Sequence, residues 1–248
     1  MAFAAAQTRT RPIPGAVATL GVSERVSFLR RTYAHLGVAL IAFAAITGGM
    51  MRFTPQFSYS FSEWALRSNL NWMLLLVAFM LVGSGARRMA LSDTSRGLQY
   101  AGLGLAVVAE AFILQPLLWV ALITSHSHAD FNKLVGSAAL ITIAIFVGLT
   151  ATVFVTKKDF SFLRGILAVS TFAALGVIIA SMIFGFQLGA LFCGVMILVM
   201  AGYVLYQTSM IAKIFPPTQH VAAALMLFST IATMFWYVLQ FLMEMNRR

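Results

Sequence analysis

The stretch that decides the fold is GILAVSTFAALGVIIASMIFGFQLGALFCGVMILVMAGYVLYQTSMIA, which occupies residues 165–212. None of its 48 residues is Lys, Arg, Asp or Glu. One crossing of a bilayer takes about 20 apolar residues of α-helix, so this stretch is too long for a single span. The segment GFQLG at residues 185–189 is the predicted turn, because glycine tolerates tight turns. The stretch therefore predicts two transmembrane helices.

Five further apolar runs have the length of one span apiece. They cover residues 32–51, 68–86, 97–125, 134–156 and 221–243. The runs lack the alternation over about ten residues that marks the strands of a membrane barrel, so they are predicted to be helices. We expect an all-α polytopic membrane protein with seven spans, in which residues 22–248 form a single transmembrane domain. The preceding residues 1–21 show no periodicity and are expected to form a disordered tail.

The composition supports lipid as the solvent. Hydrophobic residues make up 60% of the chain and charged residues 10%, whereas a soluble domain has about 25% charged residues. The net charge of +10 would suggest nucleic acid binding in a soluble protein. Here the basic residues flank the apolar runs, where they orient the helices and meet anionic headgroups. We therefore expect the lipid bilayer as a partner and no nucleic acid.

The distribution of Lys and Arg predicts the orientation. With seven spans, most of the 17 basic residues fall on the side of the N-terminus, which places that end in the cytoplasm. The C-terminus would then lie outside. Six spans would instead place both ends inside, together with Arg247 and Arg248. Short loops and the absence of a signal peptide favour a bacterial inner membrane.

Several short strings, in order and at consistent spacing, resemble the Bax inhibitor family, also called the transmembrane Bax-inhibitor-motif family. The resemblance covers roughly residues 25–243. The sharpest string is TKKDFSFL, between the fourth and fifth spans. The strings lie at residues 28–33 (FLRRTY), 148–150 (GLT), 156–163 (TKKDFSFL), 206–208 (YQT) and 223–225 (AAL).

The resemblance implies a fold in which two three-helix layers surround a central seventh helix. It also implies a function. Relatives are described as pH-sensitive calcium leak proteins, as modulators of stress responses and cell death, and in bacteria as partners or substrates of a membrane-bound protease.

The chain departs from the family at its acidic pair. The resemblance places that pair at Gln207 in the sixth span and Thr230 in the seventh, and the family's following Asn at Thr233. Neither Gln nor Thr titrates near neutral pH. Neither supplies the anionic oxygens that a hard cation such as calcium prefers. The implied calcium leak is correspondingly weakened.

Glu110 is the acid that falls within a predicted span, about 20 Å deep by the helical rise. A charge at that depth costs at least a few kcal/mol, so the carboxyl is expected to be protonated or paired. One interpretation is a proton or cation site at the middle of the membrane. The other is a neutral side chain that is hydrogen-bonded to a neighbouring helix.

The seventh span carries a polar face of Thr230, Thr233, Tyr237 and Gln240, whose spacings of three and four residues place them on one side of a helix. If the helix is central, this face either lines a pathway or supplies hydrogen bonds between helices. Gln207 is expected to meet Thr230 across the last hairpin.

Arg87 and Arg88 end the second span. They are interpreted mainly as headgroup anchors. The family resemblance implies, as the alternative, that one of them forms part of a cytoplasmic salt-bridge latch.

Enzymatic and metal chemistry find little support. Ser84 lies between two glycines but has no evident histidine partner for a nucleophile. His126, His128 and Asp130 lack a fourth ligand for a metal. The seventh span, residues 221–243, contains no lysine to hold retinal. We expect no enzyme activity, metal site or cofactor.

Two functions follow from the sequence. The favoured one is a regulatory or structural role through contacts with other membrane proteins, such as a membrane-bound protease in quality control or a larger complex. The alternative is a pH-dependent calcium or proton leak centred on Glu110 and the polar face of the seventh helix.

Overall fold

The computed structural model describes residues 21–92 and 95–246, and of the predicted tail it describes Gly21 alone. In this part of the chain seven helices are long and apolar enough to cross a membrane, as predicted. A shorter helix, α2, and a 3-10 turn, η2, accompany them. The elements are α1 (Val22–Phe53), α2 (Pro55–Leu66), α3 (Asn69–Ala90), α4 (Arg96–Thr124), α5 (His128–Thr156), α6 (Leu163–Phe184), α7 (Ala190–Lys213), η2 (Pro217–Gln219) and α8 (His220–Asn246).

The long uncharged stretch turns where its glycines predicted. Helix α6 ends at Phe184, and α7 begins at Ala190. Gly185 adopts a left-handed conformation with φ of 73°, which a residue with a Cβ enters at a cost. Its amide donates to the carbonyl of Ser181 at 2.9 Å, which caps the end of α6.

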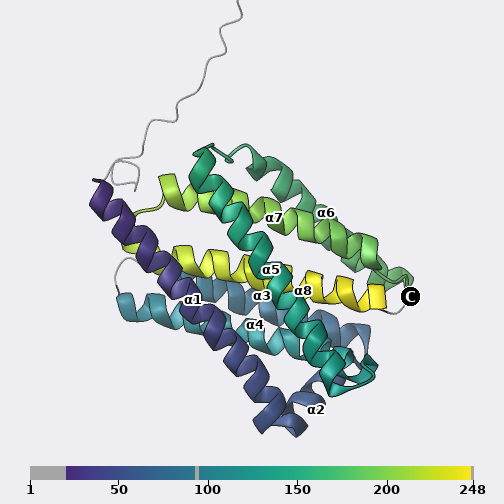
Figure 1. Cartoon of the computed structure of the whole chain (residues 1–248). Coiled ribbons are helices and arrows are strands. Elements are labelled where there is room, and N and C mark those ends of the chain that lie inside the picture. The colour runs from purple at the N-terminus through teal and green to yellow at the C-terminus, as the bar shows by residue number, and fades with distance from the viewer. Residues whose placement is uncertain (1–20, 93–94, 247–248) are drawn as a thin grey trace, which may run out of the picture.

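Helix α8 is the centre of the bundle. In its most apolar segment 67% of the residues are buried, against 6% in α3 and 11% in α6. It packs against α1, α3, α4, α5 and α7, and Figure 1 shows it (yellow) between the other helices. Helices α1, α3 and α4 form one layer, whereas α5, α6 and α7 form the other. The arrangement that the family resemblance implied is therefore confirmed.

Helix α4 is the second most buried of the seven spans, with 61% of the residues in its most apolar segment buried. Its close packing on α3 depends on Gly102, which faces Ala86 and Ala90. A Cβ at Gly102 would lie 2.5 Å from the Ala86 carbonyl oxygen and 2.7 Å from the Ala90 nitrogen. The two backbones meet only because this position has no side chain.

The segment between the first two spans forms a short helix, α2. Within α2, the Ser58 hydroxyl is fully buried and donates to Gln115 Oε1 at 2.6 Å. Trp119 Nε1 donates to the same hydroxyl at 2.8 Å. Gln115 in turn donates to the Thr47 carbonyl at 3.2 Å, so a buried polar network fastens α2 and α1 to α4.

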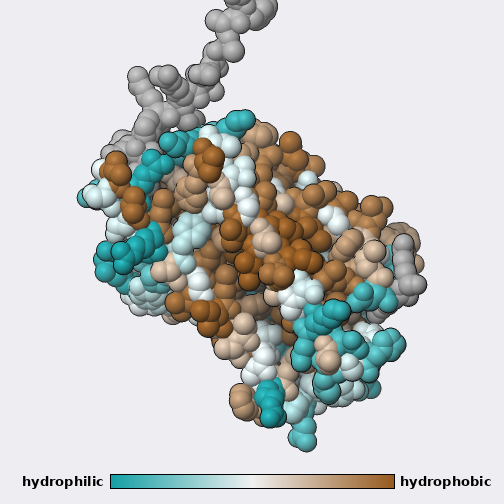
Figure 2. Space-filling view, in the orientation of Figure 1, coloured by the Kyte–Doolittle hydropathy of each residue, from teal (hydrophilic) through white to brown (hydrophobic). Residues whose placement is uncertain are grey.

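The surface is divided by polarity. Figure 2 shows brown apolar surface across the middle of the molecule and teal hydrophilic surface gathered towards its two ends. Large apolar side chains stand exposed on this surface, including Ile41, Phe172 and Leu191, each more than 70% exposed. Such a belt is stable against lipid, and water would not solvate it.

Candidate functional site

Glu110 lies near the middle of α4 and is 8% exposed. The side chain of Ser229, on the central helix α8, is its hydrogen-bond partner. Among the described residues no Lys, Arg or His forms a salt bridge with Glu110. An ionised carboxylate without a cation is costly inside a membrane protein. The site therefore consists of a buried acid without a basic ion partner, hydrogen-bonded to a hydroxyl group from the neighbouring helix.

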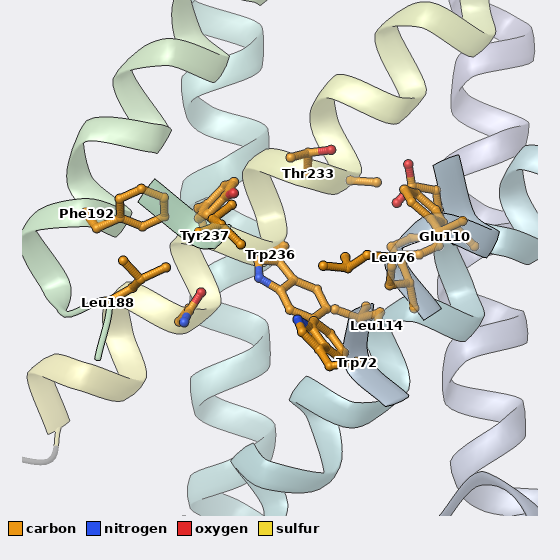
Figure 3. A pocket seen from close by; sticks show the side chains of 15 residues that line it. Trp72, Leu76, Glu110, Leu114, Leu188, Phe192, Thr233, Trp236 and Tyr237 are labelled. Atoms are coloured by element: carbon orange, nitrogen blue, oxygen red, sulfur yellow. The ribbon is translucent and has the colours of Figure 1, made fainter. Parts of the chain in front are cut away.

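Two cavities meet at Glu110. The first, here called the aromatic cavity, has a volume of about 280 Å³ and includes Trp72, Trp236 and Tyr237 in its lining (Figure 3). The second, the arginine cavity, has a volume of about 460 Å³ and includes Arg87 in its lining. The residues that line both cavities are Phe79, Glu110 and Thr233.

The two cavities extend towards opposite ends of α3. Trp72 lies near the start of this helix, and Arg87 lies in its last turn. Glu110 therefore stands between a space on one side of the bundle and a space on the other. A proton held by its carboxyl has a polar hydroxyl neighbour, Ser229, in the arginine cavity and Thr233 at the junction.

The polar face predicted on the seventh span divides into two parts. Thr233, Tyr237 and Gln240 line the aromatic cavity together with Glu110. Thr230 is not in that lining, because its hydroxyl is directed to α7. The division arises because α8 is surrounded by helices, so residues on neighbouring positions face different partners.

Thr230 and Gln207 meet across the last hairpin, as the sequence predicted. The Thr230 hydroxyl donates to Gln207 Oε1 at 2.9 Å, and both side chains are buried. The same hydroxyl lies 3.2 Å from the Met226 carbonyl. At these positions, where the family resemblance places an acidic pair, the two side chains are neutral, and the Thr230 hydroxyl is satisfied. The pair joins α7 to α8 and has no proton to exchange near neutral pH.

Arg87 and Arg88 both line the arginine cavity. Neither forms an ion pair with Glu110. A salt-bridge latch needs an acid within about 4 Å. The latch thus stays a prediction from the family resemblance, whereas the place of the two arginines at the mouth of a cavity that reaches Glu110 is a feature of the fold.

The family-like string TKKDFSFL forms the connection between α5 and α6 and is fastened to the end of α7. Lys213 Nζ lies 3.6 Å from Asp159 Oδ2, and the Phe160 amide donates to Ser209 Oγ at 3.3 Å. Partial burial opposes ionisation of Asp159, but hydrogen bonds from Ser161 and the positive charge of Lys213 outweigh it and lower the pKa of the carboxyl. This contact joins the α5–α6 connection to the end of α7 within the layer of α5, α6 and α7.

Of the predicted cluster of His126, His128 and Asp130, only Asp130 has a defined role, in the cap that begins α5. Ser127 Oγ accepts from the Asp130 amide at 3.1 Å and donates to its carboxylate at 2.8 Å, which begins α5. Among the described residues no group of three or more His, Cys, Asp or Glu side chains is arranged to hold a metal ion.

Sequence reasoning missed Ser229, Trp72 and Trp236 as members of the site. Ser229 precedes Thr233 by four residues, so helical spacing could have added it to the polar face. No comparable signal exists for the tryptophans. They come from different helices, α3 and α8, and only the packing of those helices brings them together.

Comparisons with known proteins agree with the fold. The family model described as "Inhibitor of apoptosis-promoting Bax1" matches residues 25–248. The chain is 30% identical over 233 residues to Bax inhibitor 1 of Schizosaccharomyces pombe, which covers 91% of this chain and 79% of that protein. It is 25% identical over 233 residues to Protein lifeguard 4 of Mus musculus, covering 94% of this chain and 91% of that protein. No solved structure matches the chain.

Proposed function

The chain belongs to the Bax inhibitor family, and from that premise we propose that it is a passive proton leak whose working residue is Glu110. It is a multi-pass membrane protein in contact with lipid. We place it in a bacterial inner membrane with the N-terminus in the cytoplasm, as the Lys and Arg distribution predicts. The arginine cavity then opens towards the cytoplasm and the aromatic cavity towards the outside.

The observation that carries the proposal is the position of Glu110 in the lining of both cavities. A carboxyl group can take up a proton from one side and release it to the other without moving far. Intramembrane acids are expensive to keep, and they commonly mark proton or ion pathways. The Ser229 hydroxyl, which is hydrogen-bonded to Glu110, is placed to stabilise the ionised carboxylate during the exchange.

The chemistry of the site favours protons over calcium. Calcium takes six to eight oxygen ligands, several of them anionic. Glu110 is a single carboxyl, and the Gln207–Thr230 pair is neutral and occupied by its own hydrogen bond. We therefore expect little calcium flux, and a proton flux that depends on pH because its carrier is a titrating group.

The test is flux into proteoliposomes that contain a pH-sensitive dye, with an imposed pH gradient. Glu110→Gln keeps the size of the side chain but removes the titrating group, and we expect its proton flux to fall to that of empty liposomes. Glu63→Gln is the matched control, because it removes an exposed acid on α2 away from both cavities. Wild-type flux in Glu110→Gln would overturn the proposal.

A second candidate function is contact with another membrane protein, such as a membrane-bound protease or a larger complex. The observation that favours it is the isolation of α6, which packs mainly on α7. Its free face carries Ile166, Val169 and Phe172, which are 62%, 70% and 75% exposed. A photo-crosslinking residue at Phe172 would then capture a protein in native membranes that the same residue at Ile41, on α1, does not. Identical crosslinks from both positions would argue against a partner on α6.

A further inference from the structure

We propose that the aromatic cavity is a binding site for a small organic cation with an apolar body, such as an aryl quaternary ammonium ion, and that Glu110 is its counter-ion. Binding needs only the cavity, so the proposal goes beyond proton conduction and does not require it.

The cavity has the size and surface of a small-molecule site. Its volume of about 280 Å³ lies just below the range for ligand pockets, which is roughly 300–1,000 Å³. Most of its lining is apolar, contributed by α1, α3, α4, α6, α8, the turn after α6 and the start of α7. The polar groups are few: Glu110, Thr233, Tyr237 and Gln240. An apolar wall with a few converging polar groups is the usual form of a specific pocket.

The aromatic wall suits a flat or quaternary group. Trp72 and Trp236 stack with their ring centroids 6.0 Å apart and an angle of 29° between their planes. Phe192 and Tyr237 meet edge to face at 6.1 Å. Figure 3 shows Phe192 and Tyr237 on the opposite side of the view from Glu110, with Trp236 and Trp72 between them. Aromatic faces bind apolar rings by stacking and attract cations through their quadrupole.

The charge of the cavity selects a cation. Glu110 is the only carboxyl group among the described lining residues, and none of them is Lys, Arg or His. An anion would meet no positive group there. A cation would relieve the cost of a buried carboxylate, because it would supply the partner that the protein does not. A ligand with its positive head at Glu110 and its ring on the tryptophans satisfies both ends of the cavity.

The experiment uses two probes of nearly the same shape, phenyltrimethylammonium and tert-butylbenzene, which differ in charge. Each is titrated calorimetrically into the purified full-length protein in detergent at pH 8. We expect the wild type to bind the ammonium ion about tenfold more tightly than the neutral probe. Equal affinity for the two probes, or no saturable binding of the ammonium ion, would overturn the proposal without recourse to any variant.

Variants then separate the two ends of the site. Glu110→Gln is expected to lose about tenfold in affinity for the ammonium ion and to keep its affinity for tert-butylbenzene. Trp236→Leu is expected to bind both probes more weakly than the wild type does. Glu63→Gln is expected to bind both probes as tightly as the wild type. Equal ammonium binding by wild type and Glu110→Gln would overturn the role of Glu110.

Because Glu110 serves both proposals, cation binding in the aromatic cavity should affect proton flux. Only this expectation rests on the proposed proton leak. A cation paired with Glu110 competes with its proton, so phenyltrimethylammonium is expected to inhibit proton flux into proteoliposomes. Because calorimetry measures binding without flux, the two proposals fail separately. Binding without any flux would overturn the leak, and flux without binding would overturn the cation site.

Discussion

Two polar sites lie against the central helix α8, scarcely a turn apart, and they differ in what their neighbours satisfy. At the first, Thr230 donates to Gln207 at 2.9 Å, and the pair closes on itself. At the second, Glu110 has Ser229 as a partner and borders two cavities. A buried polar group whose hydrogen bonds are all made to protein neighbours holds helices together. A buried polar group that borders a cavity and has no ion partner remains available for chemistry.

The largest expected difference is in proton flux. Thr230→Val removes the hydroxyl of the neutral pair but changes no titrating group, so flux should stay within about twofold of wild type, whereas Glu110→Gln should abolish it. The proton flux of both variants is measured in liposomes of the same preparation, which tests whether the Gln207–Thr230 pair and Glu110 differ in function. If Thr230→Val lost flux as completely as Glu110→Gln, the two sites would have to be treated as one pathway.

The next largest effect concerns the packing that positions Glu110. Gly102→Ala places a Cβ 2.5 Å from the Ala86 carbonyl oxygen, so α3 and α4 must separate. We expect a loss of about 1–3 kcal/mol in stability, seen as a lower unfolding temperature in detergent. The matched control is Gly104→Ala on the same helix, where a Cβ would meet nothing within 4 Å. Similar losses in both variants would exclude the contact with α3 as the cause, because a Gly→Ala change by itself favours a helix.

A smaller effect is expected at the neutral pair. Loss of the Thr230 hydrogen bond in Thr230→Val should cost roughly 0.6 kcal/mol, the usual value for such a contact between membrane helices. Thermal unfolding of the variant in detergent measures it. A much larger loss would show that the pair does more than join α7 to α8.

The smallest expected effect lies outside both sites, at Asp159. Because its pKa is lowered in the folded protein, its contact with Lys213 stabilises the fold at neutral pH, and that contribution is lost as the pH falls below the ordinary value of 3.8. Asp159→Asn should therefore be slightly less stable than wild type at pH 7 and equal to it in acid. The pair is partly exposed, so the difference should be small. A gap that persisted unchanged in acid would exclude the ionised pair as its cause.

The sequence by itself determined that the chain crosses a membrane and where the long uncharged stretch turns, and it favoured seven spans over six. These features depend on local quantities: the length of an apolar run, the charges at its ends and the freedom of glycine at residues such as Gly185. It also singled out Glu110, because an acid inside a span is costly wherever its helix packs. The meeting of Gln207 with Thr230 followed from their places on one hairpin.

Only the tertiary structure decided what surrounds those residues. The polar face of the seventh span divides between α7 and the aromatic cavity because α8 is enclosed by helices on several sides. Trp72 and Trp236 are far apart in the sequence, and their stacking depends on the close approach of α3 to its neighbours. The two cavities at Glu110 likewise arise from the angles and distances between helices. Those are fixed by packing among many side chains, which no pattern within a single helix encodes.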